Sequence, residues 1–401
     1  MMKILFISPY LPTVVRVRPY QFIRHLAQLG HKITLVYYDS PTAAAPDTEI
    51  RAACEKIFAF QLPKKQIIFN GLRTLPTRTP FQAKYGWLPA MYKQLVRLIN
   101  DPAAGYEVIH IEHIRGVIYG EELKARKKIR SIPMVWDSVD SITYLFRQAA
   151  RQHPSWIKRT FLNWEAQRTA GYEPKVAALF EQTLITSETD RLYFLNSGSN
   201  TPNNMSVVPN GVDLDYFSPG YQQREEKTLV ISGKMSYHAN EKMVLRLAEE
   251  ILPLIWEKDP EVKLWIVGQN PGERIRQLGT DKRITITGWV EDMRPYLQKA
   301  TLAIAPLAYG AGIQNKVLEA MACETPVVTS TSALQAITAE NSIHLFASDD
   351  PASIAEQVLF LLKNVTERNK MGKAGRIYVE NHHSWSSMAL KLTKIYQLAL
   401  K

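Results

Sequence analysis

The alternation of short apolar runs with helical patterns is the feature that most constrains the fold of this chain. The chain opens with an apolar run at Lys3–Ser8, helical apolar spacing over residues 20–29 and a β-rich run over residues 33–38. Gly30 ends the helical pattern. A strand, a helix and a strand with short connections form a βαβ unit, which requires a parallel sheet.

The same alternation returns in the second half of the chain. Further strands are predicted over residues 108–111, 134–136 and 184–186 in the first half. A strong turn signal, Asn210-Gly211, precedes a second series. Its predicted strands cover residues 229–232, 263–267, 284–287, 302–306 and 326–329, and its predicted helices cover residues 240–256, 293–299 and 315–322. We therefore predict an α/β fold of two Rossmann-like, doubly wound parallel-sheet domains that face a cleft, where ligands of such folds bind.

The length of 401 residues is too great for one ordinary hydrophobic core. We predict an N-terminal domain over residues 1–205, a C-terminal domain over residues 206–380, and a closing helix over residues 381–401 that packs back toward the first domain. No apolar run reaches about 18 residues, so no transmembrane helix is expected, and the apolar N-terminus is interpreted as a buried strand rather than a signal peptide. Cys54 and Cys323 have neither disulfide-framework nor metal-ligand spacing, which fits a reducing cytosol.

The formal net charge of +11 lies entirely in the first half of the chain. Residues 1–205 hold 27 Lys and Arg against 16 Asp and Glu, and the remainder holds 22 of each. A one-sided basic field attracts anions, such as nucleic acid, an acidic glycan or the anionic face of a membrane. Alternatively, the basic residues only keep the protein soluble and bind no partner. No nucleic-acid reader module is recognised, so no nucleic-acid partner is expected.

A loop and helix in the second half have the residues of a phosphate cradle. Residues 306–322 read PLAYGAGIQNKVLEAMA, and residues 325–328 read TPVV. Glycines such as Gly312 let backbone amides approach a ligand, and a helix N-terminus presents free N–H groups with a partial positive charge. Lys316 would add a full charge toward the same anion. Glu319, one turn on, would accept hydrogen bonds from ribose hydroxyls.

The complete string resembles the donor-site signature of family 4 glycosyltransferases, which are retaining enzymes with the GT-B fold. Other segments that resemble the family are residues 207–217, 232–235 (SGKM), 266–268 and 287–290 in the second domain, and residues 30–31 and 110–113 in the first. The resemblance implies that a nucleotide-sugar is bound by Lys234, Gly268, Gly288, Val290, Gly312, Ile313, Gln314, Asn315, Lys316 and Glu319.

The chain departs from the family pattern at two positions of the donor site. The first of the family's two glutamates would fall at Ala311, so a hydrogen bond to the donor sugar is missing or supplied elsewhere. A second lysine of the basic loop would fall at Ala239. Lys316, or alternatively Lys242, would offset that loss.

Candidate acceptor-side residues lie in the first domain. The first βα loop carries Arg16 and Arg18 in place of the paired glycines of many family members, which indicates a phosphate-bearing or acidic ligand, or else surface charge. Asp137 follows a predicted strand, with Ser138 and Asp140 beside it. These three residues orient an acceptor, or alternatively cap the helix that follows.

The predicted chemistry requires no metal. Charge that develops on a leaving diphosphate is stabilised by preorganised amides and cations, and Lys234, Lys316 and the amides of residues 312–315 meet this requirement. Asp213 and Asp215 have the spacing of a metal-binding Asp-x-Asp, but they follow the Asn-Gly turn and are interpreted as turn residues. No cluster of His, Cys and Asp in the sequence offers a metal site, so no metal or other cofactor is expected.

The resemblance implies that the sugar is transferred with retention, by attack on the face that the diphosphate leaves. In this family a polar residue at a strand end of the first domain contacts the sugar, and here that segment is residues 110–113 (HIEH). Either Glu112 or His113 faces the sugar, or else the histidine is a satisfied core residue. The predicted catalytic residues are His113, Glu112, Lys234 and Glu319.

The predicted function is that of a hexosyltransferase, which moves a sugar from a nucleotide-diphosphate donor to a glycan or lipid-linked saccharide in cell-surface polysaccharide synthesis. Basic residues over 124–130, and basic and aromatic residues over 147–168, suit the headgroups of an anionic membrane, or else the aromatic side chains belong to the core. We expect a cytoplasmic protein that is peripheral to the membrane. The alternatives are a nucleotide-sugar epimerase of the same fold and a nucleotide-sugar-binding protein that has lost catalysis.

Overall fold

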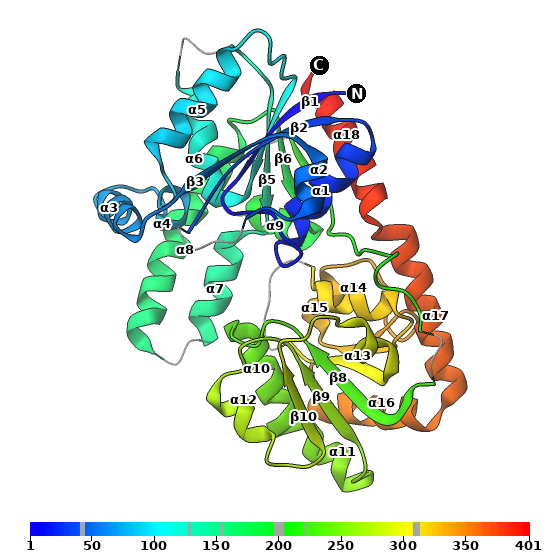
Figure 1. The fold of residues 1–401 in the computed structure, drawn as a ribbon. Coiled ribbons are helices and arrows are strands. Elements are labelled where there is room, and N and C mark those ends of the chain that lie inside the picture. The colour runs from blue at the N-terminus through cyan, green and yellow to red at the C-terminus, as the bar shows by residue number, and fades with distance from the viewer. Residues whose placement is uncertain (41–44, 127–129, 153–154, 196–203, 221–222, 308–312) are drawn as a thin grey trace. The chain divides into compact units, whose positions relative to one another are not determined.

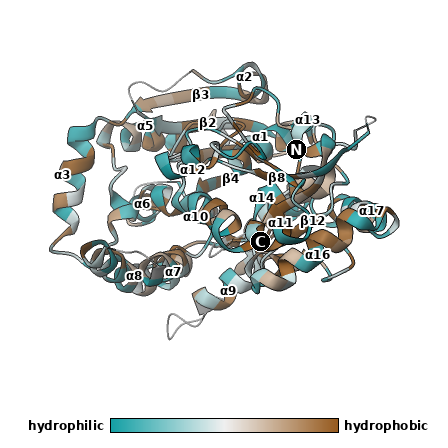
Figure 2. Cartoon of the chain, turned by 90° about the horizontal axis from the view of Figure 1, so that it is seen from below, coloured by the Kyte–Doolittle hydropathy of each residue, from teal (hydrophilic) through white to brown (hydrophobic). Residues whose placement is uncertain are grey.

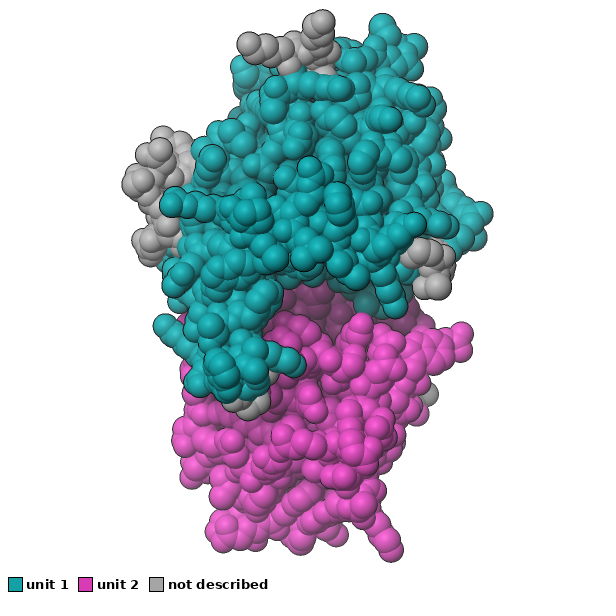
Figure 3. All heavy atoms as spheres, turned by 90° about the vertical axis from the view of Figure 1, so that its left-hand side faces the viewer, with its two compact units in different colours: residues 1–209, 385–401 teal, residues 210–384 magenta. Residues whose placement is uncertain are grey.

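The structure is a computed structural model that describes residues 1–401 except 41–44, 127–129, 153–154, 196–203, 221–222 and 308–312 (Figure 1). The chain forms two compact units, Met1–Pro209 with Trp385–Lys401 and Asn210–Ser384 (Figure 3). Each unit is built on one parallel sheet, which confirms the predicted α/β fold. Among the described helices, none is both long enough and apolar enough to cross a bilayer.

The first unit contains a seven-stranded sheet in the order β3-β2-β1-β4-β5-β6-β7. Its strands are β1 Lys3–Ser8, β2 Lys32–Asp39, β3 Cys54–Gln61, β4 Val108–Glu112, β5 Met134–Val139, β6 Gln182–Ile185 and β7 Met205–Val207. The order reverses between β1 and β4, whose residues are almost all buried. In open α/β sheets, ligands bind outside the carboxyl ends of the strands at such a reversal. These strand ends therefore position any site of the first unit.

Helices cover the first sheet, and the last helix of the chain is one of them. The helices are α1 Val17–Gln28, α2 Thr48–Ala53, α3 Lys64–Thr74, α4 Phe81–Lys84, α5 Pro89–Asn100, α6 His113–Lys124, α7 Ile142–Gln152, α8 Trp156–Ala177, α9 Glu188–Leu195 and α18 Trp385–Ala399. Helix α18 packs against α1, where the ring centroids of Phe22 and Trp385 lie 5.3 Å apart. The expected return of the closing helix to the first domain is confirmed.

The second unit contains a six-stranded sheet in the order β10-β9-β8-β11-β12-β13. Its strands are β8 Glu225–Ser232, β9 Lys263–Val267, β10 Ile284–Gly288, β11 Ala300–Ala305, β12 Val327–Thr329 and β13 Phe346–Ala347. Its helices are α10 His238–Arg246, the π-helix η1 Leu247–Ile251, α11 Leu252–Lys258, α12 Glu273–Leu278, α13 Arg294–Lys299, α14 Asn315–Ala322, α15 Thr331–Gln335, α16 Pro351–Lys363 and α17 Val365–His382.

The helix predicted over residues 240–256 is present, but it contains a π-helical turn that the sequence analysis did not predict. It runs without a break through α10, η1 and α11. Pro253 lies in the first turn of α11 and has no N–H to donate to the preceding turn, which explains the wider turn before it. Helix α14, in contrast, has the predicted bounds Asn315–Ala322.

Candidate functional site

Two neighbouring strands of the second sheet, β8 and β9, end in glycines that touch through their backbones. Gly268 has φ +146°, and a Cβ atom placed on it would lie 1.7 Å from the carbonyl oxygen of Gly233. A Cβ atom on Gly233, which has φ +149°, would lie 2.8 Å from Asn240 Nδ2. Only glycine fits such a close approach, so at the carboxyl edge of this sheet the two loops pack backbone against backbone with no side chain between them.

The N-terminus of α14 is joined to the loop after β8 by a chain of hydrogen bonds. Lys316 Nζ donates to Asn240 Oδ1 at 2.9 Å and to Gln314 Oε1 at 3.3 Å. Asn240 Nδ2 donates in turn to the carbonyl oxygen of Lys234 at 3.0 Å. Asn240 was missed by the sequence analysis. Its position in the first turn of α10, six residues after Lys234, was the signal that could have found it.

Burial shifts the pKa of both charged residues of α14 toward neutrality. It lowers the pKa of Lys316 to about 8 and raises the pKa of Glu319 to about 7, while the charge of each partner opposes the shift. Perturbed titratable groups beside a helix N-terminus and bare backbone are typical of a site for an anionic ligand. The structure therefore brings Lys316 and Glu319 together on α14 and joins Lys316, through Asn240, to the backbone of Lys234, although the roles of all three residues stay predictions.

The remaining predicted donor residues lie around this edge or outside the described residues. Asn315 Oδ1 accepts from Asn210 Nδ2 at 3.2 Å, and Ile313 is buried. Gly288, at the end of β10, has φ +68° and no atom within 4 Å of a Cβ position. Val290 lines a cavity of about 530 Å³ with Glu225, Trp265, Glu291, Asp292, Pro295, Tyr296 and Lys299. Gly312 and Ala311 fall in the part of the chain that the structure does not describe.

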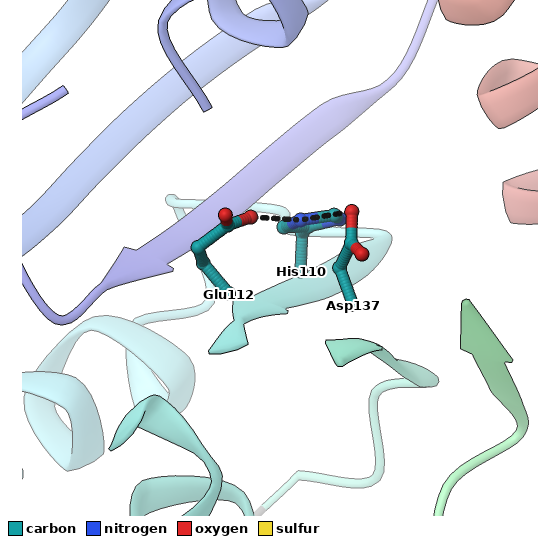
Figure 4. Close-up of side chains that lie close together, drawn as sticks. All are labelled: His110, Glu112 and Asp137. Atoms are coloured by element: carbon teal, nitrogen blue, oxygen red, sulfur yellow. Dashed lines mark ion pairs between the residues drawn. The ribbon is translucent and has the colours of Figure 1, made fainter. Parts of the chain in front are cut away.

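In the first unit, three buried polar side chains meet at the carboxyl ends of β4 and β5 (Figure 4). His110 Nε2 lies 3.6 Å from Glu112 Oε2 and 4.0 Å from Asp137 Oδ2, and none of the three side chains is exposed. Arg18 of α1 reaches the same place, where its Nε donates to Asp137 Oδ2 at 2.8 Å. Arg18 is thus not a surface charge, which was one of the two interpretations of the sequence.

Three aromatic side chains surround this buried polar cluster. Tyr396 of α18 places its hydroxyl 2.8 Å from His110 Nδ1, and Phe6 of β1 stacks on the His110 ring at 4.2 Å. The Tyr10 hydroxyl donates to Glu112 Oε1 at 3.3 Å. Burial raises the pKa of Glu112, and the nearby Asp137 raises it further, whereas His110 and Arg18 act in the opposite direction. Helix α18 therefore contributes directly to the polar centre of the first unit.

The same three side chains have the composition of a metal site, which the sequence analysis did not expect. One nitrogen and two carboxylate oxygens of His110, Glu112 and Asp137 lie near enough to hold a metal ion. The sequence did not indicate this group because its members come from two different strands. The Arg18 guanidinium already neutralises the Asp137 oxygen that would serve as a ligand, so the group has a cation of its own.

His113 lies next to the cluster, in a strained backbone conformation. It has φ +62°, which is uncommon for a residue with a side chain. Its ring is half-buried, 6.5 Å from that of Tyr10, and burial together with Arg115 and Arg16 lowers its pKa well below the usual value. The Arg16 side chain is exposed and lies 4.5 Å over the Tyr10 ring. Of the two candidates at this strand end, Glu112 is fully enclosed, whereas His113 is partly accessible.

The alternative role of Asp137, Ser138 and Asp140 as helix caps is wrong. The first N–H groups of α7 donate instead to Glu173 of α8, from Ile142 at 2.8 Å and from Thr143 at 3.3 Å, and the Tyr144 N–H donates to Ser141 Oγ at 3.2 Å. Ser138 donates to the Asp140 carbonyl oxygen, and Asp140 Oδ1 accepts from Thr186.

The Asp-x-Asp sequence after the Asn-Gly turn forms a turn, as predicted. Asp213 Oδ1 accepts from the Tyr216 amide at 3.0 Å, and the Asp213 carbonyl oxygen accepts from the Phe217 amide at 2.7 Å. The turn interpretation is therefore confirmed.

Both units of the chain match models of known glycosyltransferase families. Residues 15–216 match the family described as "Glycosyltransferase Family 4", and residues 226–364 match "Glycosyl transferases group 1". The first match alone covers half of the chain. The chain belongs to glycosyltransferase family 4.

Several relatives of this family 4 chain are named mannosyltransferases. A phosphatidyl-myo-inositol mannosyltransferase of Mycobacterium leprae is 29% identical over 47% of this chain and 52% of its own length. A GDP-mannose-dependent monoacylated alpha-(1-6)-phosphatidylinositol monomannoside mannosyltransferase of Corynebacterium glutamicum is 30% identical over 47% of this chain and 55% of its own. The chain thus matches about half the length of these relatives. An MMP alpha-(1->4)-mannosyltransferase of Mycolicibacterium hassiacum is 22% identical over 94% of this chain and 92% of its own.

Solved structures share the two-unit fold. The sucrose-phosphate synthase of Thermosynechococcus elongatus has a TM-score of 0.72 and 16% identity, over 99% of this chain and 98% of its own. HepE of Anabaena, solved in complex with UDP and glucose, has a TM-score of 0.68 and 14% identity, over 98% of this chain and 99% of its own. At these identities the likeness establishes the GT-B fold alone.

Proposed function

We propose that this chain transfers a hexose from a nucleotide-diphosphate sugar to a saccharide or lipid-linked acceptor. The observation that carries the proposal is the hydrogen-bonded chain from Lys316 through Asn240 to the Lys234 loop, beside the bare backbone of Gly233 and Gly268. It joins the Lys316 amine and the N-terminus of α14 to the loop that carries Lys234, and these are the groups that a diphosphate would need. A mannosyl donor is the first to test, because the named relatives are mannosyltransferases.

In the proposed reaction, the leaving diphosphate is stabilised by charges that are already in place. Lys234, Lys316 and the first N–H groups of α14 oppose the negative charge as the glycosidic bond to the donor breaks. Glu319 accepts hydrogen bonds from the ribose. The incoming acceptor oxygen attacks the face that the diphosphate leaves, so the anomeric configuration is retained, and His113 is the residue at the β4 end that contacts the sugar. No metal is needed in this scheme.

The acceptor is proposed to be membrane-borne, at the cytoplasmic face, in the synthesis of a cell-surface glycan. Of the three candidate acceptor-side residues, Arg16 is exposed, whereas Arg18 and Asp137 are buried and form an ion pair with each other. The basic excess of residues 1–205 favours an acidic or phosphate-bearing partner. An epimerase of the same fold would convert the donor without an acceptor, and a lapsed binding protein would leave the donor intact, so product analysis separates all three.

The proposal predicts that one nucleotide family stabilises the protein without a metal. UDP, GDP and ADP and their hexose conjugates are screened by thermal shift, with and without EDTA. A ligand at 100 times its Kd adds about 2.7 kcal/mol to the free energy of unfolding, enough to raise the melting temperature by a few degrees. Stabilisation that EDTA abolishes would contradict the metal-free scheme, and no stabilisation by any nucleotide would contradict the donor site.

Donor binding is also expected to take up protons near pH 8. Lys316, with a pKa of about 8, is about half neutral at that pH in the free protein, and a bound diphosphate favours its charged form. Binding therefore raises its pKa, and affinity falls as the pH rises from about 8 toward 10. Calorimetric titrations at pH 8 in two buffers of different ionisation enthalpy measure the uptake. Equal heats in both buffers, or an uptake unchanged in Lys316→Met, would contradict this role.

A further inference from the structure

Helix α3 turns its apolar side chains to solvent and its polar ones to the protein. Its buried residues are Asn70, Gly71 and Thr74. The exposed strip consists of Ile68, Phe69, Leu72 and Leu75, which are spaced one helical turn apart and between 53% and 63% exposed. An ordinary surface helix has the reverse arrangement. The strip is therefore unexplained by the packing of the first unit.

The start of α8 presents a second group of large exposed side chains. Trp156, Ile157, Phe161 and Trp164 lie along one side of its first turns, with Trp156 at 68% exposure and Phe161 at 52%. The interpretation that these aromatic residues belong to the core is thus wrong. We call the eight exposed apolar side chains of α3 and α8, including Leu75 at the end of α3, the docking face.

The two parts of the docking face are joined by Arg168. Its guanidinium lies 4.1 Å over the Trp164 ring. It donates to the carbonyl oxygen of Thr74, the last residue of α3, and to those of Thr77 and Thr79 just after the helix. Glu165, one turn before, accepts from the Phe81 amide at 2.9 Å. The end of α3 and the third turn of α8 therefore lie side by side, and Figure 2 shows both helices at the same edge of the first unit.

The two segments that carry the docking face, residues 56–100 and 141–164, contain no acidic residue that would repel an anionic surface. Between Glu55 and Asp101 there are only basic charged residues, Lys56, Lys64, Lys65, Arg73, Arg78, Lys84, Lys93 and Arg97. Between Asp140 and Glu165 the charged residues are Arg147, Arg151, Lys158 and Arg159. Lys64, Lys65, Arg73, Lys158 and Arg159 are exposed on α3 and α8 themselves. Apolar and cationic side chains are therefore presented together.

A cavity of about 350 Å³ opens on the inner side of α3. It is lined by Asn70, Arg73, Lys84, Trp87 and Glu122, so two cations, one carboxylate and an aromatic ring face it. The Arg73 guanidinium also lies 5.2 Å over the Phe69 ring of the docking face. A phosphate-bearing headgroup has the size and charge for such a cavity.

We propose that the docking face of α3 and α8 binds the surface of an anionic lipid bilayer. Tryptophan and phenylalanine enter the headgroup region, where an amphipathic ring is most stable, and the surrounding lysines and arginines meet lipid phosphates. The α3 strip lies in the plane of the membrane. The purpose of this contact, access to a membrane-borne acceptor, rests on the proposed function, whereas the contact itself does not.

The test is sedimentation of the full chain with vesicles. Vesicles of phosphatidylcholine alone are compared with vesicles containing 30% phosphatidylglycerol, at about 0.1 M and 0.5 M salt. Binding is expected only to the anionic vesicles and is expected to weaken at least tenfold at the higher salt, because screening weakens attraction between exposed charges. Absence of binding to anionic vesicles at the lower salt would overturn the proposal.

Two variants and two matched controls locate the contact. Trp156→Ser/Phe161→Ser and Lys64→Glu/Lys65→Glu are each expected to lower anionic-vesicle binding at least tenfold, with unchanged circular dichroism. The controls, Phe360→Ser/Ile377→Ser and Lys370→Glu/Lys373→Glu, change exposed residues of the second unit and are expected to leave binding unaltered. Equal losses in variants and controls would overturn the assignment to α3 and α8.

Two further measurements distinguish membrane binding from self-association of the chain and from failure of the proposed donor site. Sedimentation velocity without lipid is expected to give the same sedimentation coefficient for the wild-type protein and for Trp156→Ser/Phe161→Ser. A self-associated species that this variant dissociates would overturn the lipid surface in favour of a second copy of the chain. The nucleotide thermal shift is run on the same preparation, so vesicle binding without any shift rejects the donor site alone, and a shift without vesicle binding rejects the docking face alone.

Discussion

Replacing Lys316 with alanine is expected to lower kcat/KM for the sugar donor by about 10²–10³-fold, the usual cost of one group that stabilises developing charge. The amine is half-buried, its pKa is lowered to about 8, and it is held at 2.9 Å by Asn240 Oδ1. A bound diphosphate therefore meets an amine that is already partly desolvated and held in position. Initial rates with a nucleotide-hexose and a saccharide acceptor measure the effect.

The matched control is Lys242→Ala, which changes a residue of α10 two positions after Asn240. This lysine is the alternative that the sequence left open, and its replacement is expected to change kcat/KM by less than about twofold. Glu319→Gln keeps the shape of the carboxyl group and is expected to weaken donor binding more than it lowers kcat, because a ribose contact is made equally in ground and transition states. Full activity in Lys316→Ala together with a large loss in Lys242→Ala would reassign the diphosphate contact.

The donor side of this chain could be predicted because its residues are close in sequence. Residues 306–322 hold a strand end, a glycine loop, Lys316 and Glu319 in one segment, and α14 has the predicted bounds. Asn240 was missed because its bond to Lys316 joins positions 76 residues apart. Strands β3, β7 and β13 were also missed, since edge strands are short or half-exposed and lack the apolar runs of central strands.

The polar centre of the first unit could not be predicted in the same way. The segment HIEH indicated a site at the end of β4, but the partner of His110 is Tyr396, which lies 286 residues away. Arg18 and Asp137, separated by 119 residues, form an ion pair that no local pattern indicates. The exposed apolar residues of α3 were missed because no helix was predicted over residues 64–74, and helical periodicity alone does not show which side of a helix faces solvent.

The Arg18–Asp137 pair is expected to dominate the stability of the first unit. Both side chains are buried, at 5% and 0% exposure, with 2.8 Å between Arg18 Nε and Asp137 Oδ2. Removing one partner leaves a buried charge without compensation, so Asp137→Ala is expected to cost about 3–5 kcal/mol of unfolding free energy. Urea unfolding followed by circular dichroism measures this. The second unit has the same sequence in all variants. If only one unfolding transition moves to a different urea concentration, that transition therefore belongs to the first unit.

Two variants decide whether the cost belongs to the buried charge. Arg191→Ala removes a partner from the exposed Arg191–Glu188 pair, at 38% and 65% exposure, and is expected to cost less than about 1 kcal/mol. Arg18→Met/Asp137→Leu removes both buried charges and is expected to be less destabilising than Asp137→Ala alone, although Arg18 also donates to the Val208 carbonyl oxygen at 3.0 Å. A double variant that loses the sum of the two single losses would mean that the pair is not coupled. The stability of this strand end would then come from the hydrogen bonds of Arg18 to the backbone, and Asp137 would be free to serve the acceptor.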